Sequence, residues 1–187
     1  MRTTLLAVAA VALSGCGAAT AARPATDAPR YEAHGVSVVL PAGWTHATRS
    51  LTPGLFDPRE VMSVATYPLE YRRIGCNHMP SSALADIGPR DAFVTLMERG
   101  RGNEWKSFPP RPAHFSAALG GRSEAIDCVP GAHFTDHWFG FSDAGRHFHV
   151  LVAFGPDAPA AVRDEAWAVL DGLRVDPSVQ PDWDSTG

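Results

Sequence analysis

Histidines are the residues of this chain whose type and spacing are best suited to metal chemistry. The sequence contains eight, of which His133 and His137 are four residues apart and His147 and His149 are two apart. Alternate residues of a strand share one face, so His147 and His149 could begin a zinc site built on imidazole nitrogens. The alternative is that these histidines lie on a half-exposed sheet face and bind nothing.

The register of a predicted hairpin decides whether His137 joins His147 and His149. With a two-residue turn, His137 lies opposite Val150 and on the wrong face. One bulged residue moves it opposite Leu151, on the face of the other two histidines. The sequence leaves both registers open. A zinc site would require these three side chains to converge, and zinc is the only metal cofactor that the residues suggest.

A fourth candidate for chemistry is the cysteine that ends the first apolar run. Arg2 precedes the apolar residues 5–13, and the segment closes with Leu13, Ser14, Gly15 and Cys16. The run is shorter than the roughly 20 residues that span a bilayer, and it has the length of an export-signal core. The segment resembles the lipobox of bacterial lipoproteins. The alternatives are an ordinary signal peptide with a chance cysteine and a transmembrane anchor.

The lipoprotein resemblance implies a defined organisation of the N-terminal region. Residues 1–15 would be a signal peptide, and Cys16 would become the new N-terminus with diacylglycerol on its thiol. Residues 16–30 are rich in Ala, Pro and Thr and predict a disordered tether with a reach on the order of 20 Å. We therefore expect a lipid-anchored protein on the extracytoplasmic face of the cell membrane, with membrane lipid as its first partner.

The two remaining cysteines are Cys76 and Cys128. Export would place them in an oxidising compartment, where an even pair predicts a disulfide. Closing a loop of about 53 residues would stabilise the fold by roughly 4 kcal/mol on the chain-entropy model. Two buried free thiols are the alternative. Neither cysteine belongs to a C-x-x-C motif, so the sequence offers no support for redox catalysis.

Composition limits the remaining function classes. Residues 31–175 have the size of one domain, and residues 176–187 predict a frayed polar tail. The formal net charge of −4, with no basic cluster beyond Arg72-Arg73, argues against nucleic-acid binding. No G-x-S-x-G, H-E-x-x-H, glycine-rich phosphate loop or EF-hand loop occurs. The sequence therefore contains no positive sign of an enzyme.

The elements that would position these residues are mainly strands. Alternating apolar residues predict a strand at 36–40, and β-rich runs predict others at 61–69 and 91–100, the last with a helix as the alternative. Residues 81–88 predict a single helical turn. Residues 107–117 predict a polyproline connector that leads into a short strand.

A hairpin and a helix close the domain. Two aromatic runs within 136–155 flank a predicted turn at 142–145, and Phe148, Val150, Val152 and Phe154 alternate toward one face. Asp157 is a candidate helix cap, and Gly172 is a candidate end. Five apolar residues recur between them at helical spacing, namely Val162, Ala166, Val169, Leu170 and Leu173. The sequence predicts an α+β domain: a mostly antiparallel sheet with a C-terminal helix packed on it and one disulfide.

Two resemblances accompany this prediction. The stretch Leu40-Pro41-Ala42-Gly43-Trp44, with the order of the elements, resembles PsbP-like domains. The segments "ALADIGPRDAFVTLMERG", "FPPRPAHF", "FSDAGRHFHVLVAFG" and "AVLDGLRV" are similar to a family of actinobacterial exported proteins of unknown function. That second resemblance implies an envelope location and no activity.

The hypothesis that follows is a membrane-anchored, non-catalytic binding or envelope-assembly module. Its ligand would be an envelope protein, a lipid or a glycan, taken up in a groove lined by some of its aromatic residues. The alternatives are a metal carrier or metalloenzyme built on His137, His147 and His149, and an accessory domain with a purely structural role.

Overall fold

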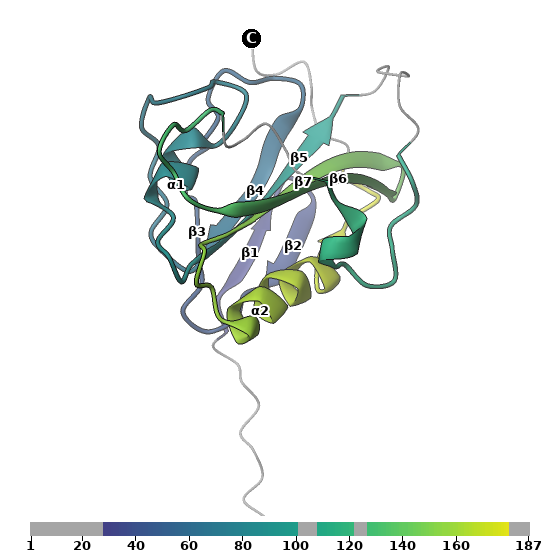
Figure 1. Cartoon of the computed structure of the whole chain (residues 1–187). Helices are drawn as coiled ribbons and strands as arrows, with labels where there is room; N and C mark the ends of the chain where they lie inside the picture. The colour runs from purple at the N-terminus through teal and green to yellow at the C-terminus, as the bar shows by residue number, and fades with distance from the viewer. Residues whose placement is uncertain (1–27, 101–107, 122–126, 180–187) are drawn as a thin grey trace, which may run out of the picture.

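The computed structural model of the chain describes residues 28–100, 108–121 and 127–179, which fold into two antiparallel sheets and a C-terminal helix (Figure 1). The α+β class predicted from the sequence is confirmed. The strands are β1 (Arg30–Ala33), β2 (Val36–Val39), β3 (Thr45–His46), β4 (Arg59–Ala65), β5 (Ala92–Arg99), β6 (Thr135–Asp143), β7 (Arg146–Phe154) and β8 (Arg174–Val175). The helical elements are α1 (Ser81–Asp86), the 3₁₀ turn η1 (Ala117–Leu119) and α2 (Ala160–Asp171).

The larger sheet has five strands in the order β3-β4-β5-β7-β6. Its central strands, β5 and β7, pair along their whole length, from Ala92 opposite Phe154 to Arg99 opposite His147. Both strands are almost entirely buried, which explains why 91–100 lacks the alternation of a half-exposed strand. The strand predicted there from β-branched residues and flanking Gly and Pro is confirmed.

The smaller sheet, β1-β2-β8, and helix α2 cover one face of the five-stranded sheet. Val36, Val38 and Leu40 point from this side into the main core, as their alternation predicts. The four alternating residues of β7 meet them there: Phe148, Val150, Val152 and Phe154. Helix α2 adds Ala166, Val169 and Leu170. The expected apolar faces of hairpin and helix therefore form one core.

A second apolar cluster lies on the opposite face of the five-stranded sheet. It contains Phe93, Leu151 and Ala153 from the central strands, and Ala83 and Leu84 from α1. The segments around the two cysteines complete it, so the sheet is covered on both faces. Figure 1 shows α1 and α2 at well-separated places around the sheet.

The β6–β7 turn differs from the prediction. Asp143 pairs with Arg146, so the two turn residues are Ala144 and Gly145, with φ of +51° and +73°. A hairpin turn of this kind needs positive φ at both positions, and glycine takes it without steric cost at the second. The loop therefore sits one residue later than the Asp143-Ala144 turn expected from the sequence.

The segment after β7 differs as well. Helix α2 begins at Ala160 with Pro159 at the N-cap position and no side-chain cap, so the prediction that Asp157 caps it is wrong. The Asp157 backbone N–H is instead 2.7 Å from the Pro89 carbonyl oxygen, to which it donates. Gly172 ends the helix as predicted.

The strand expected at the end of 107–117 is not formed within the described part of that segment. An isolated bridge between Pro110 and Ser142 lies there, and η1 follows. Arg111 ties this connector to the end of α2: its guanidinium donates to the carbonyl oxygens of Leu170, Asp171 and Leu173.

Candidate functional site

The hairpin register separates the three histidines proposed as metal ligands. His137 lies opposite Val152, and His149 lies opposite Gly140. Facing residues of antiparallel strands project to the same side of the sheet, so His137 shares a face with Val152 and not with His147 or His149. The register that would have brought the three imidazoles together is not formed, because the turn has two residues and the pairing from Thr135 to Asp143 contains no bulge.

His147 and His149 pack against aromatic rings. The ring of His149 stacks on Trp138 at a centroid distance of 5.0 Å and meets Phe108 edge-on at 4.9 Å. The ring of His147 stacks on the ring of Phe108, with the two ring centroids 5.2 Å apart. Arg99 Nε donates to His149 Nε2 at 3.3 Å. The positive charge of the Arg99 guanidinium at this nitrogen disfavours a metal cation there. His147 and His149 therefore contribute to aromatic packing.

His137 lies on the opposite face, beside α2. Its ring meets Trp167 at 5.5 Å and Phe154 at 6.0 Å, both edge-on. Burial lowers the pKa of His137, against the opposite effect of the Asp136 carboxylate. A zinc site on His137, His147 and His149 thus stays a prediction. The arrangement of the three imidazoles gives it no common centre.

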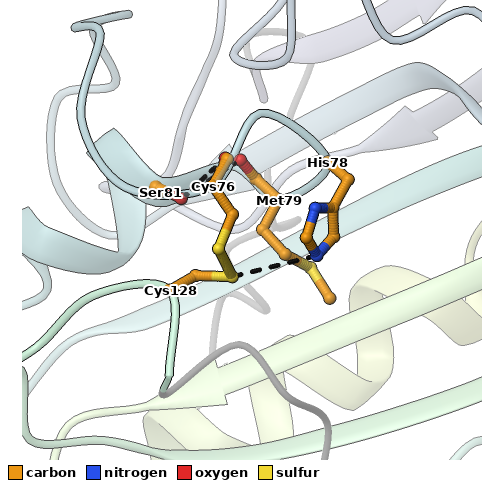
Figure 2. Close-up of a disulfide and its surroundings, with 5 residues drawn as sticks. All are labelled: Cys76, His78, Met79, Ser81 and Cys128. Atoms are coloured by element: carbon orange, nitrogen blue, oxygen red, sulfur yellow. Dashed lines mark hydrogen bonds between the residues drawn. A yellow bond between two sulfur atoms is a disulfide. The ribbon is translucent and has the colours of Figure 1, made fainter.

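The predicted disulfide is confirmed. Cys76 and Cys128 are bonded, with Cα atoms 5.0 Å apart (Figure 2). His78 Nε2 lies 3.9 Å from Cys128 Sγ, so the two sulfurs and one imidazole form a compact group of potential metal ligands. Thiolates bind metal, however, and a disulfide has none to offer. This group in its bonded form therefore stabilises the fold and is not a metal centre.

A cavity of about 580 Å³ opens between the two sheets. One wall is β1 and the turn that follows it, and the other is the segment 46–50 with the adjacent half of β4. Its lining mixes hydroxyl, imidazole, guanidinium and carboxylate groups with apolar side chains: Arg30, Tyr31, Glu32, Ala33, His34, His46, Ala47, Thr48, Arg49, Ser50, Glu60, Val61, Met62 and Ser63. The volume falls in the range of small-molecule sites. This cavity is the strongest candidate site among the described residues.

The cavity exists because β3 is short. Strand β3 pairs only with Val64 and Ala65, so the first half of β4 has no neighbour on that side within the described part of the sheet. Strand β1 belongs to the other sheet and reaches across the gap, where the Tyr31 hydroxyl donates to the Val61 carbonyl. Burial, and then the Glu60 carboxylate, raise the pKa of Tyr31 to about 12, so this hydroxyl keeps its proton.

Glu60 organises one wall of the cavity. Its Oε2 accepts hydrogen bonds from the backbone N–H groups of Leu51 and Thr52, at 2.7 and 3.0 Å, and from the hydroxyls of Ser50 and Thr52. Its Oε1 accepts from the Ser63 hydroxyl at 2.5 Å. A buried carboxylate is tolerated when such donors replace its water. Glu60 thereby holds the segment 50–52 against β4.

The opposite wall is held by a buried ion pair. Arg146 Nε and Nη2 donate to the two carboxylate oxygens of Glu98 at 2.6 and 2.8 Å, and both side chains are 2% exposed. The same guanidinium donates to the carbonyl oxygens of His34 and Gly35 in the β1–β2 turn. The pair therefore joins the small sheet to the large one at the edge of the cavity.

His34 stands in the left-handed region, with φ of +53°, as the first residue of that two-residue turn. Burial, followed by the charge of Arg59 and Arg146, lowers the pKa of its imidazole. His34 is therefore a neutral group on the cavity wall at neutral pH. Because left-handed backbone at a residue other than glycine is uncommon, His34 could have been singled out only from the folded chain.

Sequence reasoning missed this site. It focused on the hairpin histidines, whereas the cavity draws on residues from three separate segments. The turn-like pair His34-Gly35 was the only local signal, since glycine at the second turn position marks a hairpin.

Cys16, the predicted lipidation site, lies outside the described residues, as do the whole of the predicted signal peptide and most of the tether. Within the described ranges, no helix is both long and apolar enough to cross a bilayer.

The chain was also compared with known proteins. It matches no protein-family model, and no curated protein matches it.

Proposed function

We propose that the protein is a membrane-tethered, non-catalytic binding module on the extracytoplasmic face of a bacterial envelope. Its ligand occupies the cavity between β1 and β4. The observation that carries this proposal is the cavity itself, about 580 Å³ in volume and open to solvent between two cross-braced sheets. The Leu13-Ser14-Gly15-Cys16 segment supports the tether, because acyl chains on Cys16 would anchor the domain.

The build of the cavity supports binding over catalysis. Its carboxylate Glu60 is hydrogen-bonded on both oxygens, and its phenol Tyr31 keeps its proton. The Glu60 oxygens are thus occupied by the protein's own donors, and the Tyr31 phenol is not a base, so neither group is set up for general base catalysis. The walls are braced by Glu60 and by the Glu98–Arg146 pair, which makes a preformed ligand site.

The tether is tested in the bacterial host with the full chain and its Cys16→Ser variant. We expect the wild-type protein in the membrane fraction with an acylated N-terminal cysteine by mass spectrometry. We expect the variant to be found without lipid. A wild-type N-terminus without lipid on a freely released protein would rule out the anchor.

The binding role is tested by native mass spectrometry of the full chain extracted from the envelope in mild detergent. We expect a bound small molecule that is lost in Thr48→Trp, which places an indole in the mouth of the cavity. The control is Ala168→Trp on the exposed side of α2. Equal retention by both variants, or no bound molecule in the wild-type protein, contradicts the proposal.

A further inference from the structure

Two arginines and two histidines line the cavity. Arg30 lies on β1, Arg49 lies on the facing segment, and the imidazoles of His34 and His46 line the space between. All four residues are exposed to solvent. They come from two segments that are separated in the sequence, and the folding of one sheet against the other brings them together.

The side chains of Arg30 and Arg49 take no part in the ion pairs and hydrogen bonds that hold the described residues together. Arg72, Arg99, Arg111 and Arg146 each pair with a carboxylate. In contrast, neither Arg30 nor Arg49 forms an ion pair or a side-chain hydrogen bond with another residue in the part of the chain that the structure describes. Their guanidinium donors remain available to a ligand. Five N–H groups in a planar fork make arginine the preferred partner of phosphate and carboxylate oxygens.

Of the two carboxylates that line the cavity, one is exposed and one is buried. Glu60 is buried and is saturated by Ser50, Leu51, Thr52 and Ser63. Glu32 is the remaining carboxylate of the lining, and its charge offsets part of the charge of the two arginines. The solvent-exposed charges of the lining are therefore two guanidiniums and one carboxylate, and this excess of positive charge favours an anion at the rim.

The other residues of the lining and the size of the cavity indicate the chemical class of the anionic ligand. Thr48 adds a hydroxyl next to Arg49, and a group with several acceptor oxygens would use more of these donors than a carboxylate can. The side chains of Val61, Met62 and Tyr31 lie behind the cavity wall in the main core. The cavity is also larger than a bare phosphate ion requires, which leaves room for an organic body.

We propose that the cavity binds the phosphate group of an organic phosphate ester, through Arg30 and Arg49. This inference rests on the proposed function, because it names the ligand of the same site. Two sources share this chemistry: the headgroup of an anionic phospholipid and a soluble phosphate ester. The first is within reach of a tethered domain, since β1 begins where the predicted tether ends.

The test is calorimetric titration of the detergent-solubilised full chain with three probes. These are glycerol 3-phosphate, short-chain phosphatidylglycerol and, as a carboxylate, succinate. We expect at least one phosphate probe to bind, and Arg30→Gln/Arg49→Gln to weaken that binding about tenfold or more. The matched control, Arg90→Gln/Arg174→Gln, removes two exposed arginines outside the cavity and should bind as the wild type does.

The probes separate the outcomes. Binding of phosphatidylglycerol alone identifies a lipid headgroup, and binding of glycerol 3-phosphate identifies a soluble ester; both support the proposal. Succinate binding as strong as phosphate binding overturns it, as does an equal loss in the control variant. No binding of either phosphate probe also overturns it. In that case, a molecule retained in native mass spectrometry and lost in Thr48→Trp leaves the binding module standing.

Discussion

The two sides of the five-stranded sheet are held together by different means. At the cavity side, β1 and the segment 46–50 are braced by carboxylates: Glu60 through neutral donors and Glu98 through Arg146. At the cysteine side, a covalent bond between Cys76 and Cys128 joins two loops over an apolar cluster. The first arrangement leaves an open cavity of about 580 Å³, whereas a pocket of only about 10 Å³ lies beside the disulfide.

This difference explains why the cavity side is a candidate binding site, whereas the disulfide side only stabilises the fold. Polar bracing fixes the two walls of the cavity through a few directional bonds, so the space between them does not need to be filled with side chains. Apolar packing stabilises by excluding water, and it therefore closes the space around Cys128 and its neighbours. We expect changes on the two sides to affect stability comparably and ligand binding differently.

Breaking the ion pair should have the largest effect on stability. Glu98→Gln leaves the buried Arg146 without its counter-charge, and removing one partner of a buried pair costs about 3–5 kcal/mol. Urea unfolding measures the loss, with Glu70→Gln on the surface as the control. A change below about 1 kcal/mol, the size of an exposed pair, would show that water reaches Arg146.

Removing the disulfide should come next. The Cys76→Ala/Cys128→Ala variant opens a loop with a sequence separation of 52, and we expect it to lose about 2–4 kcal/mol of unfolding free energy. Phosphate-ester binding in the cavity should be unchanged, because the disulfide contributes nothing to its lining. A tenfold loss of binding in this variant would show that the two sides are coupled.

Glu60→Gln should cost less and act locally. The amide keeps one acceptor oxygen, but its NH₂ group faces donors that the carboxylate had accepted, so we expect a loss of about 1–3 kcal/mol. Hydrogen exchange should rise at the amides of Leu51 and Thr52 and stay unchanged at α1. Uniform exchange across both sides of the sheet would contradict the local role of Glu60.

The smallest expected effect is a dependence of stability on pH. His34 and His137 have lowered pKa values in the folded chain, chiefly through burial, so the unfolded chain takes up protons at these sites more readily. Their stabilising contribution is present in full above the unfolded pKa of about 6.5 and is lost as the pH falls toward the folded values. We expect the unfolding free energy to decrease over this range.

The variant His34→Asn sharpens this prediction. Asparagine tolerates the left-handed backbone of the turn but does not titrate, so part of the slope below pH about 6.5 should disappear. His133→Asn, at an exposed position before β6, is the control and should keep the slope of the wild type. An unchanged slope in His34→Asn would show that its imidazole titrates alike in both states.

Several elements of the fold could be predicted from local pattern. The alternation of Phe148, Val150, Val152 and Phe154 predicts a strand with one buried face, and all four side chains lie in the main core. The helical stripe around Val169 predicts α2 in the same way. These predictions succeed because burial of a periodic apolar face depends on neighbours within the same element.

The candidate site could not be predicted in this way. One extra residue in the β6–β7 turn would change the face on which His137 lies, and turn geometry depends on backbone preferences that several residues of 142–145 satisfy. The cavity depends on a gap beside β3 and on a contact from Tyr31 to β4. Neither leaves a pattern in the neighbouring sequence.

The sequence alone was sufficient for the α+β class, the strand-rich order, the cysteine pairing and the apolar face of α2, because each depends on residue type, count or short-range period. Only the tertiary structure decided which histidines stand near which rings, and that Arg30 and Arg49 line one cavity without a partner among the described residues. These are relations between segments distant along the chain, and their energies arise only when the two sheets pack together.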